Sequence, residues 1–148
     1  MTKREKQRAE KFEVLTEIVN ALQPAYVYAS QSKKALMETI IGAAIFYMPA
    51  LKNKCYTGLV SEAVKAESAG SGRKVKEHLY PRKVSGRELL SATPVTADKL
   101  MNLHFTKYGR YNYVTRKENS RLRPYQKAEV FVSPEDSYRK ANIRLVTE

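Results

Sequence analysis

A break near the middle of the chain constrains the fold more than any other feature of the sequence. Ser68-Ala-Gly-Ser-Gly72 combines three small residues with two glycines and predicts a flexible joint. The composition changes there, because both histidines and six of the ten tyrosines follow the break. The 148 residues suffice for one domain, or for a core with an extension. We therefore predict a helical region over residues 1–68, a joint over 69–72, a module over 73–123 and an extension over 124–148.

The first region has the periodicity of helices. Apolar residues recur at spacings of three and four, which lines one helix face: Phe12, Leu15, Ile18, Val19 and Leu22. Pro24 predicts the end of this helix.

Two further helices are predicted in the same region. One runs from an N-cap at Ser32 to about Met48, and Pro49 closes it. Its side chains are apolar nearly all round, which predicts a central position in the fold. A third, short helix is predicted over Gly58–Glu67.

The module after the joint begins and ends with strand signals. Val75–Tyr80 is a short extended candidate, and Tyr111–Val114 is rich in aromatic and β-branched residues, which predicts a second strand. A long insert over 81–110 separates them. It carries two short helix signals, at Gly86–Leu90 and Thr96–Leu103.

Helix-start signals mark the rest of the chain. Thr115-Arg-Lys-Glu118 has the capping-box pattern and predicts a helix that runs through Leu122 until Pro124. Lys127–Val132 is a further strand candidate. Ser133, followed by proline and two acids, predicts another helix start. The predicted class is α+β.

The charge balance predicts a polyanionic partner. Lys and Arg number 27 against 15 for Asp and Glu, a formal net charge of +12. Such an excess repels itself, and a nucleic acid relieves it by exchanging counterions for Lys and Arg contacts. We predict nucleic-acid contacts at two groups of cations, although a scattered cationic surface is the alternative: Arg73, Lys74, Lys76, Arg82, Lys83 and Arg87, and then Arg116, Lys117, Arg121 and Arg123.

The sequence also predicts a cytoplasmic protein. Cys55 is the only cysteine, so one chain forms no disulfide, which fits a reducing compartment. The polar start over Met1–Arg8 lacks the pattern of a secretory signal. The most apolar stretch, Ile40–Leu51, is too short to span a bilayer and predicts a buried helix.

Polar residues gather at the ends of the elements predicted for the module. Glu77, His78 and Pro81 end the first strand, and Asn119 lies one turn into the helix after the second. A histidine with a pKa near neutrality is a good general base. A carboxylate and an amide oxygen suit a hard cation such as Mg²⁺, which stabilises charge on a leaving oxygen. These residue types fit the hydrolysis of a phosphodiester bond.

This pattern resembles that of the HNH endonucleases, the ββα-metal nucleases. Their first motif is an acid followed by His, two residues and Pro, and Glu77-His78 with Pro81 has that form. Their last motif is Asn or His on a short helix directly after the second strand, and Val114–Leu122 with Asn119 is similar. The resemblance covers about Val75–Leu122. It implies a two-stranded antiparallel hairpin with a long loop, followed by a helix.

The resemblance also implies roles for these residues. His78 would activate water as the general base, while Glu77 and Asn119 would hold one divalent ion, Mg²⁺ or Mn²⁺. No structural zinc is expected, because Cys55 is the single cysteine and lies outside the module. Packing of the N-terminal helices or of the C-terminal segment would then brace the module.

The middle residue of the motif has several candidates. We choose Asn112, which would orient the histidine or its loop, while Asn102 and His104 compete for the role. His104 lies between Leu103 and Phe105, so simple packing explains it better. His78 and Asn119 each have a plain alternative as well, as exposed polar residues without a special role.

The expected function is that of a metal-dependent DNA endonuclease, of the free-standing homing or restriction type that the resemblance implies for small phage and bacterial proteins. Residues 1–68 would brace the module and dock double-stranded DNA, in the host cytoplasm if the protein is encoded by a phage. Cutting both strands would require a homodimer or sequential nicking. The alternative is a non-catalytic basic protein that binds DNA or RNA, such as a phage regulator or a nucleoprotein component.

Overall fold

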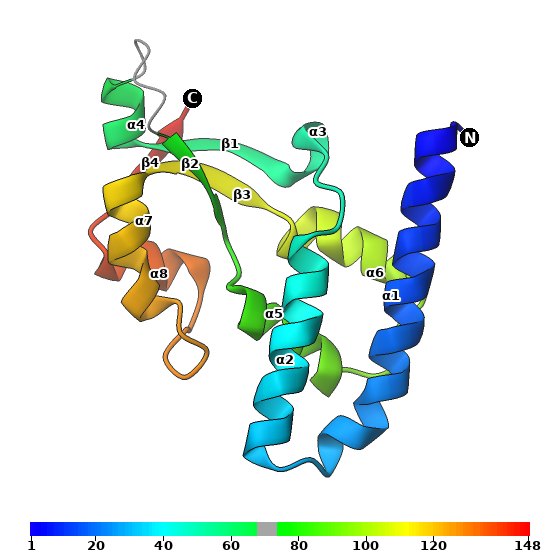
Figure 1. Ribbon diagram of the computed structural model, residues 1–148. Coiled ribbons are helices and arrows are strands. Elements are labelled where there is room, and N and C mark those ends of the chain that lie inside the picture. Colours follow the sequence, from blue (N-terminus) through cyan, green and yellow to red (C-terminus); the bar gives the residue numbers. More distant parts are fainter. Residues whose placement is uncertain (68–73) are drawn as a thin grey trace.

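The computed structural model describes residues 1–67 and 74–148, so the predicted joint at Ser68–Gly72 lies outside the described residues. The described part combines helices with a four-stranded sheet, which confirms the α+β class (Figure 1). The elements are α1 (Lys3–Val27), α2 (Gln31–Phe46), α3 (Lys52–Cys55), β1 (Tyr56–Ser61), α4 (Glu62–Ala66), β2 (Lys74–His78), α5 (Arg82–Ser91), α6 (Ala97–Leu103), the π-helix η1 (His104–Tyr108), β3 (Tyr111–Thr115), α7 (Arg116–Leu122), the 3₁₀-helix η2 (Arg123–Tyr125), α8 (Pro134–Lys140) and β4 (Leu145–Thr147).

Helix α1 continues past Pro24, so the predicted end there is wrong. A proline inside a helix costs about 3 kcal/mol. Buried hydrogen bonds on both sides of Pro24 help to hold this part of the helix. The side-chain amide of Gln23 donates to the carbonyl of Leu89 at 2.9 Å, and the hydroxyl of Tyr26 donates to the carboxylate of Glu38 at 2.7 Å.

Helix α2 differs from its prediction in two ways. Its N-cap is Ser30, two residues before the predicted cap, and the helix ends at Phe46. The helix is also less central than predicted, because Leu36 and Ile40 are 61% and 51% exposed. Its other side packs closely on α5.

Two glycines set the distance between α2 and α5. A Cβ atom at Gly42 would overlap the backbone carbonyl of Arg82, and a Cβ atom at Gly86 would overlap that of Glu38. The two helix backbones therefore touch where these glycines meet. This contact fixes the start of α5, which follows β2 directly.

The predicted helix over Gly58–Glu67 is wrong in its first half. Residues Tyr56–Ser61 form β1, and only Glu62–Ala66 form a helix. Gly58 has a φ of 81°, in the left-handed region that favours glycine. β1 pairs in parallel with β3 and antiparallel with β4, so its backbone bonds go to partners far along the chain.

The strand order is β2-β3-β1-β4, which makes β2 an edge strand. β2 and β3 pair antiparallel, as the hairpin prediction requires, with Glu77 opposite Asn112 and His78 opposite Tyr111. In the insert between them, α5 and α6 confirm the two predicted helix signals, and helices with η1 occupy most of the predicted long loop. The sheet takes β1 from the predicted helical region and β4 from the predicted extension.

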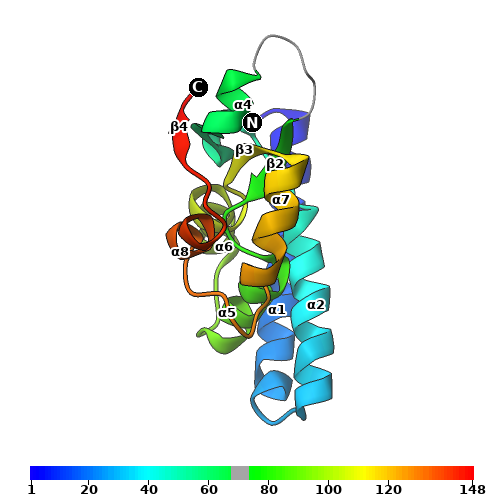
Figure 2. The same cartoon turned by 90° about the vertical axis from the view of Figure 1, so that its left-hand side faces the viewer.

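Each face of the sheet carries a hydrophobic core. Tyr111 joins a cluster built mainly from α1, α2, α5, α6 and η1, whereas Val114 joins a smaller cluster with Leu122 and Tyr138. Figures 1 and 2 show these two groups of helices beside the sheet, with α1 and α2 antiparallel to each other. The core thus joins residues from both sides of the predicted joint.

The C-terminal part mixes confirmed and wrong predictions. Thr115 and Glu118 form the predicted capping box at the start of α7, and the hydroxyl of Ser133 caps α8. Lys127–Val132 is not a strand, because Lys127 accepts backbone bonds from Val130 and Phe131 within a local turn. β4 is an additional strand that the sequence did not predict.

Candidate functional site

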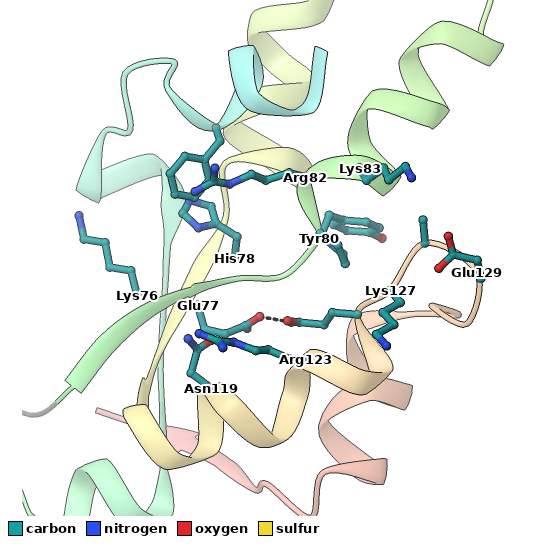
Figure 3. Close-up of a pocket in the computed structure, with 14 residues that line it drawn as sticks. Lys76, Glu77, His78, Tyr80, Arg82, Lys83, Asn119, Arg123, Lys127 and Glu129 are labelled. Carbon is teal, nitrogen blue, oxygen red and sulfur yellow. Dashed lines mark hydrogen bonds between the residues drawn. The ribbon is translucent and has the colours of Figure 1, made fainter. Parts of the chain in front are cut away.

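A basic pocket of about 580 Å³ lies against the edge strand β2 (Figure 3). The end of β2, the start of α5, the middle of α7 and the segment after η2 form its walls. The lining residues are Phe46, Lys76, Glu77, His78, Tyr80, Pro81, Arg82, Lys83, Asn119, Arg123, Gln126, Lys127, Ala128 and Glu129. Three of the four predicted catalytic and metal-binding residues are therefore brought together: Glu77, His78 and Asn119.

Glu77 and His78 reach this pocket from opposite sides of β2. Successive side chains of a strand alternate between its faces, and Figure 3 shows Glu77 on the side of β2 that faces α7 and Asn119, whereas His78 lies on the other side beside Arg82. Both contribute to one pocket because β2 is an edge strand, and the pocket extends around its free edge.

The carboxylate of Glu77 is buried and held by two donors. Only 3% of the residue is exposed. The amide of Gln126 donates to one carboxylate oxygen, and the hydroxyl of Tyr138 donates to the other. Burial raises the pKa of Glu77 to about 7, although the two hydrogen bonds act in the opposite direction.

The predicted role of Asn112 is to orient His78 or its loop, but its side chain forms its hydrogen bonds on the Glu77 side of the sheet. Its amide donates to the hydroxyl of Tyr138 at 3.0 Å, and its carbonyl accepts from the hydroxyl of Thr57. The cause is the strand register, which places Asn112 directly opposite Glu77. A chain of hydrogen bonds thus runs from Thr57 through Asn112 and Tyr138 to Glu77.

His78 is packed against aromatic rings. Its ring centroid lies 4.8 Å from that of Phe46 and 6.0 Å from that of Tyr111. Burial, together with repulsion from His104, Arg82 and Lys76, lowers the pKa of His78 to about 4. The imidazole is consequently neutral at neutral pH, and it is a weaker base than a histidine whose pKa lies near neutrality.

His104, a competing candidate, has a packing role. It is buried, its ring lies 5.5 Å from that of Phe12, and its Nε2 is 3.2 Å from the carbonyl of Pro49.

The structure places the predicted cations in different positions. Four of them line the pocket: Lys76, Arg82, Lys83 and Arg123. Lys74 and three residues of α7 lie elsewhere on the surface, outside the pocket lining: Arg116, Lys117 and Arg121. Arg73 lies outside the described residues. Lys127 also lines the pocket, although it is not among the predicted nucleic-acid contacts.

Arg87, another of the predicted contacts, forms bonds within the protein. Its guanidinium pairs with Glu38 at 3.0 Å and donates to the carbonyl of Ala128 at 3.0 Å. These bonds join α2, α5 and the segment after η2. The guanidinium of Arg87 therefore bonds to other parts of the protein.

Both oxygens of the Glu77 carboxylate already accept hydrogen bonds, from the amide of Gln126 and the hydroxyl of Tyr138, so a divalent cation would have to displace one of these donors. One carboxylate from Glu77 is accompanied by the side-chain amides of Asn119 and Gln126. Mg²⁺ typically binds through one or two carboxylates with several waters. In residues 1–67 and 74–148, no three His, Cys, Asp or Glu side chains gather around one point. If a cation binds here, Glu77 and Asn119 are the residues that would hold it, with water in its other positions.

No protein-family model, curated protein or solved structure matches the chain. No helix in the described part is long and apolar enough to cross a membrane.

Proposed function

We propose that the protein is a metal-dependent endonuclease that hydrolyses phosphodiester bonds in DNA. One observation carries the proposal: Glu77, His78 and Asn119, which a short HNH-like motif singles out, line the same pocket. The motif residues Glu77 and Asn119 lie 42 positions apart in the sequence, so the motif alone does not guarantee that they meet.

The pocket residues suggest a division of labour. Glu77 and Asn119 would hold the cation, which would supply charge stabilisation to the phosphate. Neutral His78 would accept a proton from the attacking water. Tyr138 and Gln126 would keep the Glu77 carboxylate in one orientation.

The cations of the pocket support a polyanionic substrate. Five line it, whereas Glu129 is the only acidic side chain in the lining besides Glu77. Arg82 is braced, because its guanidinium carbon lies 3.4 Å from the centroid of the Phe46 ring. An arginine held in this way can bind a phosphate at a fixed position.

The direct test is nicking of a supercoiled plasmid with Mg²⁺. We expect the wild type to nick it, and His78→Ala to reduce the rate by about 10² to 10⁴-fold. Asn119→Ala should also reduce the rate, and added Mn²⁺ should restore part of it. The exposed Asn102→Ala is the matched control and should leave the rate unchanged. Absence of metal-dependent nicking by the wild type would refute the proposal.

A second candidate is a basic protein that binds nucleic acid without cleaving it. The hydrogen bonds that already occupy both oxygens of Glu77 favour it, because they give the carboxylate a structural role. This candidate predicts tight, salt-dependent DNA binding that His78→Ala leaves unchanged, and no cleavage under any metal condition.

A further inference from the structure

One face of the sheet carries tyrosine rings beneath the side chains of lysines. Lys74, Lys76 and His78 share this face of β2, because successive side chains of a strand alternate. On β3, Tyr113 lies opposite Lys76 and Tyr111 lies opposite His78. Figure 3 shows Lys76 on the same side of β2 as His78. The group that we call the tyrosine–lysine face adds one residue of β1 and one of α3, and consists of Tyr56, Tyr111, Tyr113, Lys52, Lys74 and Lys76.

The three rings form one aromatic cluster. Tyr56 stacks on Tyr111 with the ring centroids 5.6 Å apart. Tyr113 contacts both rings with its edge, at 5.2 Å from Tyr56 and 5.6 Å from Tyr111. Tyr111 is buried, whereas Tyr56 and Tyr113 keep part of their surface exposed. The buried ring therefore supports two outer rings, which offer a rigid aromatic surface.

Each of these rings lies under a lysine ammonium group. The distances from the ammonium nitrogen to the ring centroid are 4.4, 4.8 and 5.8 Å for the pairs Lys74–Tyr113, Lys76–Tyr111 and Lys52–Tyr56. All three lysines are exposed. A cation–π contact at an exposed site is weak. The ammonium group can therefore leave the ring for a phosphate, and this movement uncovers the ring for a base.

One carboxylate of the chain is already bound beside these lysines. Glu148 accepts a hydrogen bond from the hydroxyl of Tyr56, and its carboxylate lies 3.8 Å from the Nζ atom of Lys74. The hydrogen bond from Tyr56 is the main cause that lowers the pKa of Glu148, and Lys74 and Lys52 lower it as well. The tyrosine–lysine face thus binds an anion within the protein. A phosphate offers the same kind of oxygen acceptor.

We propose that the tyrosine–lysine face binds an unpaired stretch of DNA, with bases stacked on Tyr56 and Tyr113 and phosphates bound by the lysines of the face. Aromatic rings interleaved with cations suit a single strand, because every unpaired base has a free ring face. Lysines alone would attract a duplex as well, so the rings favour the single strand. Lys76 also lines the basic pocket. The choice of DNA over RNA rests on the function proposed for that pocket.

Fluorescence anisotropy with a labelled oligothymidylate of about ten nucleotides tests the proposal. A chelator is present, so the outcome does not depend on cleavage. Tyr113→Leu should weaken binding by about five- to a hundredfold, because it removes a stacking ring, whereas Tyr113→Phe should keep the wild-type affinity. Tyr56→Leu and Tyr56→Phe form a second pair of this kind. Tyr28→Leu is the matched control, since Tyr28 is 91% exposed at the end of α1. Equal affinities of the leucine and phenylalanine variants at both positions would overturn the proposal.

A duplex of equal length separates stacking from the attraction of charges. The wild type should bind the single strand more tightly than this duplex, and Tyr113→Leu should weaken only the binding of the single strand. Equal losses for the single strand and the duplex would overturn the role of unpaired bases. Tighter binding of an oligouridylate than of the oligothymidylate would overturn DNA as the partner.

Two further variants test the phosphate contacts. Glu148→Gln should tighten single-strand binding by up to about fivefold, because the carboxylate no longer competes for Lys74. Lys74→Ala should reduce the slope of log affinity against log salt by about 0.7 in magnitude, because one phosphate contact is lost. Tyr113→Leu should leave this slope unchanged, since a stacked base releases no counterion. An unchanged affinity in Glu148→Gln together with an unchanged slope in Lys74→Ala would overturn the phosphate contacts.

Discussion

At the scale of single residues, Glu77 depends on side chains from distant parts of the chain. Gln126 and Tyr138 lie 49 and 61 positions away in the sequence, and they hold both oxygens of its carboxylate. Tyr138 is itself held by Asn112, so its hydroxyl hydrogen is directed at Glu77. The hydrogen bond from Tyr138 favours the charged form of the carboxyl group.

The first prediction concerns this hydrogen bond. We expect Tyr138→Phe to raise the pKa of Glu77 above its value of about 7, since the charged carboxylate loses a donor. The free energy of unfolding should fall by about 1–3 kcal/mol, because Asn112 and Glu77 lose a buried partner. Carboxyl ¹³C NMR titration measures the pKa. Tyr125→Phe is the control, and an unchanged Glu77 titration in Tyr138→Phe would contradict the assignment.

The two adjacent site residues give stability opposite pH dependences. Because the pKa of Glu77 is about 7 in the folded state against an ordinary 4.5, stability falls as pH rises through this window. Because the pKa of His78 is about 4 against an ordinary 6.5, stability falls as pH decreases through that window. In the wild type these two effects of pH on stability oppose each other over most of the same pH range.

Single substitutions should separate the two slopes. Relative to wild type, Glu77→Gln should gain stability as pH rises from about 4.5 to 7. His78→Asn should gain stability as pH falls from about 6.5 to 4. Each gain should be at most about 1.4 kcal/mol per pH unit. Urea unfolding at several pH values, with a chelator present, measures the differences. Differences that do not vary with pH would show that the two groups titrate alike in the folded and unfolded states.

At the scale of elements, the close contact of α2 with α5 determines where the pocket wall begins. Arg82 and Lys83 form the first turn of α5 and line the pocket. Gly42 touches the backbone at Arg82, so the packing of two helices also sets the position of a proposed phosphate-binding side chain. Larger residues at this contact would displace the pocket wall.

We expect Gly42→Ala to lower the free energy of unfolding by about 2 kcal/mol, because the added methyl group overlaps backbone that cannot rotate away. An unhindered Gly to Ala change in a helix has the opposite sign and adds up to about 1 kcal/mol. The sign of the change therefore decides between the two effects. Urea denaturation is the measurement, and Thr39→Ala on the exposed side of α2 is the control that should be nearly neutral.

Local signals predicted elements well, and pairing over long distances explains most of the errors. The caps of α7 and α8 are formed by neighbouring residues, so Thr115 and Ser133 sufficed to locate both helix starts. β1 forms its hydrogen bonds with β3 and β4, and no local sequence feature near Gly58 predicts this pairing. The candidate site follows the same division. Glu77 and His78 belong to a short motif, whereas Gln126, Tyr138 and Thr57 reach Glu77 only through the folded chain.

At the scale of the whole molecule, the chain carries a net charge of +12, and some of its cations line the pocket. Five lysine and arginine residues line the pocket, and Glu129 is the only exposed acidic residue in this lining. Binding to DNA should release condensed counterions, with a slope of about −0.9 in log affinity against log salt for each phosphate contacted.

The last prediction is therefore a change in this slope. Lys127→Ala should reduce the magnitude of the slope by about 1, because one phosphate contact is lost. Lys99→Ala, an exposed substitution on α6 away from the pocket lining, should leave the slope unchanged. Fluorescence anisotropy with a labelled duplex at several salt concentrations measures both, and equal slopes for the two variants would contradict a role for Lys127.

The position of β2 at the rim of the sheet has a consequence for how the protein behaves in solution. An outer strand offers backbone groups to any extended chain, which makes it a starting point for aggregation. Lys74 and Lys76 lie exposed along this strand, and like charges keep other strands away. Concentrated salt screens that repulsion, so the purified protein should precipitate more readily as salt rises. A bound polyanion would cover the strand and its lysines together, which leaves the ligand-free protein as the form at risk.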